Sequence, residues 1–233
     1  MKIGYIIICR YNSSRLPGKI LKKIEGKEIL MYIYERIRQV ASKDQVVVAT
    51  SVEAEDDKIA AFCAQNDISC YRGPLDNVAW RFLKCAEQYG FEYATRINGD
   101  NIFMDTETLR NMTAITRSGG FQFISNLKNR TFPRGMSVEI VNVDYYKSIY
   151  PKFNDDTHKE HVTLYMYENE KESDNFYYFF NTSVPEAAGI QLAIDNESDF
   201  SLVTKIIRRF DRPHTDYGLK EIIQIRADIL EGK

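Results

Sequence analysis

The sequence predicts an α/β fold, with a single domain over residues 1–233 and a mostly parallel central sheet that helices cover on both faces. Two observations predict it. Short, nearly continuous apolar runs such as KIGYIIIC (residues 2–9) are typical of strands buried on both faces. Amphipathic segments of about 10 to 15 residues separate these runs, and such alternation indicates right-handed βαβ units.

The first part of the chain supplies the repeating units. After the strand at 2–9, residues 28–40 place Ile29, Ile33 and Ile37 at helical spacing. Three further strands are expected at 45–50 (QVVVAT), 68–73 (ISCYRG) and 91–97 (FEYATRI). The helices between them are expected at 52–66, which begins with acidic residues, and at 76–90, which begins at an Asp and ends at a Gly.

Residues 121–185 show a different pattern and predict a small mixed α+β subregion. Strands are expected at 121–126, 137–143 and 176–182, and a helix at 156–170. The aromatic run from Tyr177 to Phe180 suits either edge strands that pack on the main core or an arm that forms a dimer. The chain then returns to an apolar strand at 190–196 and an amphipathic helix at 197–210.

The composition limits the class of protein. The 31 basic and 33 acidic residues give a net charge of −2, so no general attraction to nucleic acid or to an anionic membrane is expected. No apolar stretch approaches the roughly 18 residues that span a bilayer, and the N-terminal apolar run is too short for a signal peptide, which predicts a cytoplasmic protein. The four cysteines form no C-x-x-C pair, which indicates reduced, buried thiols.

A basic loop follows the first strand. Arg10, Arg15 and Lys19 gather around a turn at Pro17 and Gly18, without the spacing of a Walker A loop or of a G-x-G-x-x-G motif. Guanidinium and ammonium groups in this arrangement can neutralise a polyphosphate. A solvated basic turn is the alternative.

This loop, RYNSSRLPGKIL, resembles the R-x-x-S-x-R-L-P-G-K-x-L signature of the CMP-sugar-acid synthetases, the cytidylyltransferases that activate 3-deoxy-manno-octulosonate and sialic acids. The nearest likeness is to the spore-coat polysaccharide branch. Four more segments match that branch in the same order: RINGDNIFMD, FPRGMSVEIV, KEHVTLYMY and AIDNESDF. The likeness covers about residues 3–210.

The resemblance implies a three-layer, Rossmann-like nucleotidyltransferase fold and a set of site residues. Arg10, Ser13, Arg15 and Lys19 would hold the triphosphate of CTP, with Arg15, Lys19 and Asp100 catalytic. Asp100 and Asp195 would bind Mg²⁺, which typically takes one or two carboxylates together with substrate phosphates. Both carboxylates follow strand candidates, where open α/β sheets bind ligands. From the residues alone, Asp100 also suits a turn and Asp195 a helix cap.

Other positions carry weaker expectations from the same resemblance. Arg72 lies where it puts cytosine recognition, although RGPLDN is also an ordinary entry to a helix. Arg134, Glu139 and His161 would contact the acceptor. The first two also suit a surface ion pair, and His161 suits helix packing or capping.

The resemblance implies a Mg²⁺-dependent enzyme that transfers CMP from CTP to a small-molecule acceptor and releases pyrophosphate. The acceptor would be a sugar acid or a related surface-polysaccharide precursor, and the enzyme a homodimer. One rival is a GT-A-like glycosyltransferase that consumes a nucleotide sugar, although GDNIF lacks the Asp-x-Asp metal motif. The other is a non-catalytic nucleotide-binding module.

Overall fold

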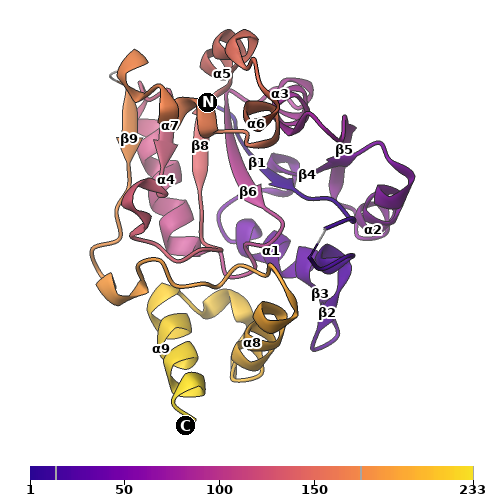
Figure 1. Cartoon of the computed structure of the whole chain (residues 1–233), viewed down its shortest axis with the longest axis vertical. Coiled ribbons are helices and arrows are strands. Elements are labelled where there is room, and N and C mark those ends of the chain that lie inside the picture. The colour runs from indigo at the N-terminus through magenta and orange to yellow at the C-terminus, as the bar shows by residue number, and fades with distance from the viewer. Residues whose placement is uncertain (14, 174, 233) are drawn as a thin grey trace.

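A seven-stranded sheet forms the centre of the protein in the computed structural model, which describes residues 1–13, 15–173 and 175–232 (Figure 1). Across the sheet the strands are β5 (Ser69–Gly73), β4 (Val46–Ser51), β1 (Ile3–Ile8), β6 (Tyr93–Asn98), β8 (Glu139–Asn142), β7 (Phe123–Ser125) and β9 (Phe176–Tyr178). The first four are parallel to one another. β8 runs antiparallel to β6 and to β7, and β9 runs parallel to β7.

Helices cover both faces of this sheet, which confirms the predicted α/β architecture. Side chains alternate along β1, so that Tyr5 and Ile7 join one buried cluster and Ile6 joins the other. The first cluster packs against α1 (Ile29–Arg38), α2 (Asp57–Gln65), α4 (Thr106–Ser118), α8 (Glu197–Ile207) and α9 (Leu219–Leu230). The second packs against α3 (Val78–Gln88), α5 (Val143–Ile149) and α7 (Leu164–Glu168).

The subregion at 121–185 extends the main sheet. Its strands β7, β8 and β9 continue the ladder beyond β6, and Figure 1 shows β9 at the edge opposite β5. The predicted edge strands are therefore present, and the dimer interpretation of these residues stays a prediction. A separate hairpin of β2 (Lys23–Ile24) and β3 (Lys27–Glu28) precedes α1.

Two expected elements differ from the structure. The helix expected at 156–170 is interrupted: α6 (Asp156–Glu160) ends at His161, whose φ of −99° and ψ of 84° are not helical, before α7 begins. The strand expected at 190–196 is wrong, because only an isolated bridge between Gln191 and Arg134 forms there. Its apolar side chains Leu192 and Ile194 are nonetheless buried, which accounts for the strand-like sequence pattern.

Among the described residues, no helix is both long and apolar enough to cross a bilayer.

Several elements were not expected from the sequence, namely the β2–β3 hairpin, α4, α5 and α9. Asp105 caps α4, because its Oδ2 accepts hydrogen bonds from the Thr108 amide at 2.8 Å and from the Thr108 hydroxyl at 2.7 Å.

Candidate active site

Hydrogen bonds hold the described residues of the basic loop after β1. The Tyr11 amide donates to Oδ1 of the buried Asp56 at 2.6 Å, and the Ser51 amide donates to Oδ2 of the same carboxylate at 2.9 Å. Burial acts to raise the pKa of Asp56, but the hydrogen bonds from Ser51 and Tyr11 lower it overall, so Asp56 remains an acceptor. The Gly18 amide closes the turn on the Tyr11 carbonyl at 2.8 Å.

A cavity of about 370 Å³ opens beside this loop, at the carboxyl ends of β1 and β6. Most of the predicted site residues line it: Arg10, Ser13, Arg15, Lys19, Asp100, His161 and Asp195. The structure therefore brings together the loop after β1, the turn after β6, the end of α6 and the segment before α8.

Cations from the loop face carboxylates from distant segments across this cavity. Lys19 Nζ donates to the Ile194 carbonyl at 2.7 Å and lies 3.8 Å from Asp100 Oδ2. Arg15 Nη2 lies 2.9 Å from Asp195 Oδ1. Because the side chains of Lys19 and Asp100 are only 16% and 23% exposed, this charge pair is less screened by solvent than a surface pair.

The turn after β6 positions Asp100. The Asn101 amide donates to the Asn98 carbonyl at 3.1 Å, and the Asn101 side chain donates to the Ser137 carbonyl at 2.9 Å. Burial raises the pKa of Asp100, the Asp195 carboxylate adds to the rise, and Lys19 opposes it. Asp195 lines the same cavity as Asp100, so the two carboxylates are the candidate ligands for a divalent cation there.

Three predicted residues do not line the cavity. Arg72 braces the turn between β4 and α2, where Nε donates to the Ser51 carbonyl at 2.8 Å and Nη1 lies 2.7 Å from Asp57 Oδ1. Arg134 is exposed, and its backbone bridges to Gln191. Glu139 is fully buried within β8. Arg72 and Glu139 therefore bind other groups of the protein itself.

The cavity also contains two arginines that the sequence interpretation missed, Arg81 on α3 and Arg96 on β6. Arg81 is 2% exposed, and its Nη1 donates to the Pro74 carbonyl at 2.6 Å. Arg96 carried a detectable signal, since it is the charge nearest the carboxyl end of the expected strand 91–97. A charged residue at that place in a buried strand points to the ligand-binding edge of the sheet.

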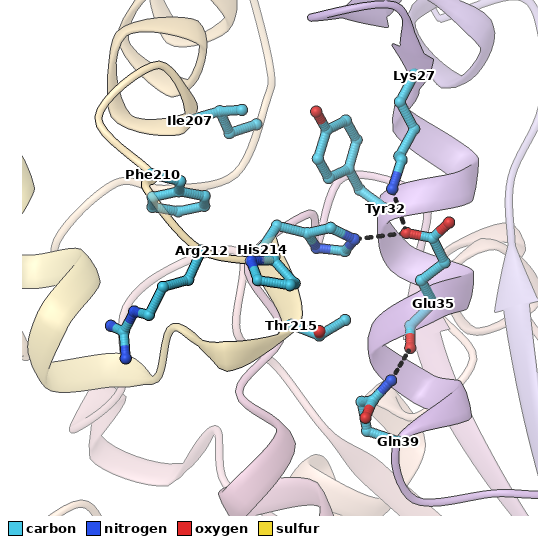
Figure 2. Close-up of a pocket in the computed structure, with 10 residues that line it drawn as sticks. Lys27, Tyr32, Glu35, Gln39, Ile207, Phe210, Arg212, His214 and Thr215 are labelled. Atoms are coloured by element: carbon cyan, nitrogen blue, oxygen red, sulfur yellow. Dashed lines mark hydrogen bonds and ion pairs between the residues drawn. The ribbon is translucent and has the colours of Figure 1, made fainter.

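A second cavity of about 380 Å³ lies between α1 and the segment that joins α8 to α9. Figure 2 shows Lys27 and His214 converging on Glu35, with His214 Nε2 2.6 Å from Glu35 Oε2. Arg36 lies behind this cluster and donates to the His214 carbonyl at 2.6 Å. No predicted site residue lines this cavity, and Lys27, Glu35 and His214 bind one another. They hold two segments of the chain together.

Comparisons with known proteins agree with this arrangement. A family model described as cytidylyltransferase matches residues 5–226. The spore coat polysaccharide biosynthesis protein SpsF of Bacillus subtilis is 30% identical over 234 residues, which cover 96% of this chain and 93% of that protein. A 3-deoxy-manno-octulosonate cytidylyltransferase of Syntrophotalea carbinolica is 45% identical over 62 residues, which are 27% of this chain and 25% of that protein. The solved structure of a cytidylyltransferase from Leptospira borgpetersenii superposes with a TM-score of 0.91 at 27% identity, covering 99% of this chain and 96% of that one.

Proposed function

We propose a reaction from the premise that the chain belongs to the cytidylyltransferase family: it transfers the CMP group of CTP to a small-molecule acceptor and releases pyrophosphate. One observation carries the proposal. Arg15 and Lys19 of the basic loop meet the carboxylates Asp195 and Asp100 in a single cavity at the ligand-binding edge of the sheet. This combination of charges suits a polyphosphate and a divalent cation.

In the proposed reaction, a hydroxyl oxygen of the acceptor attacks the α-phosphorus of CTP. A new phosphorus–oxygen bond forms as the bond to the bridging oxygen of the β-phosphate breaks, so pyrophosphate leaves and the hydroxyl proton passes to solvent. The chain contributes positioning and charge neutralisation, with no covalent intermediate. Arg15 and Lys19 stabilise the negative charge that develops on the leaving pyrophosphate, and Arg10 and Ser13 complete the binding of the triphosphate.

Asp100 and Asp195 fit a magnesium ion. Their oxygens are the hard ligands that Mg²⁺ prefers, and Mg²⁺ typically takes one or two carboxylates together with oxygens of the substrate phosphates. Burial and then the Asp195 carboxylate raise the pKa of Asp100, and a divalent cation bound by these residues would relieve the repulsion between the two charges. When bound, Mg²⁺ would neutralise phosphate charge and polarise the α-phosphate.

We propose a sugar acid or a related surface-polysaccharide precursor as the acceptor. The relatives support this class, since one is named for 3-deoxy-manno-octulosonate and another for spore-coat polysaccharide. The cavity supports it as well, because five basic side chains and three carboxylates line it: Arg10, Arg15, Lys19, Arg81 and Arg96 against Asp100, Glu160 and Asp195. A second anionic substrate is favoured by a surplus of positive charge.

Pyrophosphate release from each nucleoside triphosphate, with Mg²⁺ and a panel of sugar acids, tests the reaction. We expect pyrophosphate release with CTP and with none of the other nucleoside triphosphates. Release with UTP or GTP but not with CTP would contradict the proposal. Hydrolysis of a nucleotide sugar without pyrophosphate release would indicate a glycosyltransferase. Binding of CTP without any turnover would indicate a non-catalytic binding module.

Lys19→Ala tests the role of the loop. We expect turnover to fall about 100-fold or more, because a donor that stabilises developing charge is lost. Lys23→Ala is the matched control, since Lys23 is 61% exposed and pairs with Glu28 outside the cavity. Equal rates for the two variants would leave the loop as a solvated basic turn.

A further inference from the structure

Arg96 lines the active-site cavity, but the carboxylate that binds it does not. It stands directly opposite Glu139 in the antiparallel register of β6 and β8, and its Nη1 forms an ion pair with Glu139 Oε2. The side chain of Glu139 is fully buried and that of Arg96 is 16% exposed. The pair therefore connects the interior of the sheet to the cavity wall.

Three donors fix the Glu139 carboxylate. Besides Arg96, the Thr163 hydroxyl donates to Oε1 at 2.6 Å and the Tyr167 hydroxyl at 2.8 Å. Burial, and then the nearby Glu139 carboxylate, raise the pKa of Tyr167, so this phenol stays protonated and remains a donor. Since Tyr167 uses its proton on Glu139, Ser125 Oγ supplies the hydrogen bond between Ser125 and Tyr167.

This network sets the direction of the Arg96 guanidinium. Thr163, which donates to Glu139, lies two residues after His161, and His161 lines the same cavity. Glu139 therefore binds Arg96 directly and the segment that carries His161 through Thr163. Within the described part of the chain, Glu139 is the only acceptor that binds this guanidinium, and Nη2 is left for a ligand. A guanidinium whose position is fixed in this way suits a charge-assisted hydrogen bond from Nη2 to a carboxylate oxygen.

Two other cations of the cavity are paired with different carboxylates. Arg15 and Lys19 come from the basic loop and lie against Asp195 and Asp100, where the triphosphate and the metal are proposed to bind. Arg96 and His161 come from the sheet and from the end of α6. A sugar acid adds one negative charge to those of CTP, and it needs a counter-charge of its own in a partly buried site.

We infer that Arg96 recognises the acidic group of the acceptor and that Glu139 is a positioning residue that holds the Arg96 guanidinium toward it. The inference rests on the proposed function and assigns substrate specificity within the same cavity. It also explains how Glu139 can affect the acceptor although its side chain does not line the cavity. Loss of Arg96 then affects the acceptor and leaves CTP binding unchanged.

The test compares acid acceptors with their neutral esters. The probes are 3-deoxy-manno-octulosonate, N-acetylneuraminate and the methyl ester of each, with pyrophosphate release from CTP as the readout. For the wild-type protein we expect kcat/KM to favour the acid over its ester by about 30- to 100-fold, the value of a charge-assisted hydrogen bond. Arg96→Gln should reduce that preference to within about threefold, and Arg96→Lys should restore part of it. Arg110→Gln, an exposed substitution on α4, is the matched control.

The positioning role of Glu139 requires its own variants. Glu139→Gln should raise KM for the acid acceptor about tenfold and leave KM for CTP unchanged. Because the loss of a buried carboxylate can unfold a protein, Tyr167→Phe serves as a milder variant, with an expected rise of about threefold in acceptor KM. Unchanged acceptor KM in folded samples of both variants would contradict the role of Glu139.

The outcomes separate the inference from the proposed function. Calorimetry with CTP and Mg²⁺, in the absence of any acceptor, should give the same affinity for Arg96→Gln as for the wild-type protein. Weaker CTP binding with an unchanged preference for acids would make Arg96 a phosphate contact and overturn the inference. Turnover of CTP with neutral acceptors only would overturn the inference alone, whereas no pyrophosphate release from CTP with any acceptor contradicts the proposed function and the inference together.

Discussion

Gly99 lets β6 bring Asp100 close to the end of β1. A Cβ atom at this position would lie 2.7 Å from Cys9 Cβ and 3.1 Å from Ile20 Cδ1, both of which belong to the wall of the active-site cavity. Any side chain at position 99 would therefore push the turn that carries Asp100 away from the basic loop that carries Lys19.

Gly99→Ala should therefore lower both stability and activity. We expect the free energy of unfolding to fall by about 1–3 kcal/mol, the usual cost of overpacking, and turnover to fall because Asp100 moves relative to Lys19. Urea denaturation and pyrophosphate release measure the two effects. Gly218→Ala is the control, since the nearest atom to its added Cβ is Asp105 Oδ1 at 3.5 Å. Equal stability of the two variants would contradict this account.

At the same scale, the sequence identified groups that stand in turns and missed those that stand in regular elements. Arg15, Lys19 and Asp100 were recognisable because they stand in segments that resemble a family signature, whereas their charges alone also suited solvated turns. Arg81 and Arg96 face the cavity from a helix and a strand, where a charge is ordinarily assigned to a solvated face. Burial distinguishes these two arginines from surface charges, and it depends on which helices and strands pack together.

Among the elements, α1 has an unusual connection to the end of the chain. Arg36 of α1 is fully buried and donates to the backbone carbonyls of Met104, Tyr217 and His214. Burial lowers the pKa of Arg36 to about 10, which still leaves the guanidinium charged at neutral pH. One side chain thus joins α1, the segment before α4 and the segment before α9.

The His214–Glu35 contact beside Arg36 predicts a dependence of stability on pH. Burial lowers the pKa of His214, and Arg36 and Lys27 lower it further, while the hydrogen bond to Glu35 opposes them. The folded protein therefore binds a proton at His214 less readily than the unfolded chain, whose histidine pKa is about 6.5. The stabilisation is complete above that pH and is lost as the pH falls through it toward the lower folded value.

The measurement is the free energy of unfolding of wild-type protein and of His214→Gln between pH 8 and pH 5. We expect the wild-type protein to lose more stability than the variant below about pH 6.5. Comparing how steeply the free energy of unfolding changes with pH removes the pH-independent loss of stability that the substitution itself causes. Parallel curves would show that His214 does not titrate differently in the folded and unfolded states.

Elements were predictable where one physical cause dominates the sequence pattern. The parallel strands β1, β4 and β6 are mostly buried, and their apolar runs follow directly, whereas β5 lies at the edge of the sheet and is only partly buried. Residues 190–196 have the same burial without a ladder, so the same pattern gave a wrong strand. The break at His161 depends on the packing of α6 against α3, which no local pattern contains.

At the scale of the whole molecule, the two ends of the sheet have different surroundings. Loops and helices extend the protein beyond β5, while β9 leaves its outer edge unpaired by any described strand. Tyr177 and Phe180, on or next to β9, are 37% and 42% exposed. An unpaired edge strand with exposed aromatic side chains favours association with another chain.

We therefore expect a homodimer that forms through β9 and the adjacent aromatic residues. Sedimentation equilibrium should give twice the 27.1 kDa mass of one chain at micromolar concentrations. Tyr177→Lys combined with Phe180→Lys should shift the mass to that of a single chain, because charges on an edge strand oppose pairing and cost much to bury. Leu230→Lys, at the 60% exposed end of α9, should leave the dimer intact. A wild-type protein that sediments as one chain would contradict the dimer. A double variant that remains a dimer would show that the interface lies elsewhere on the molecule.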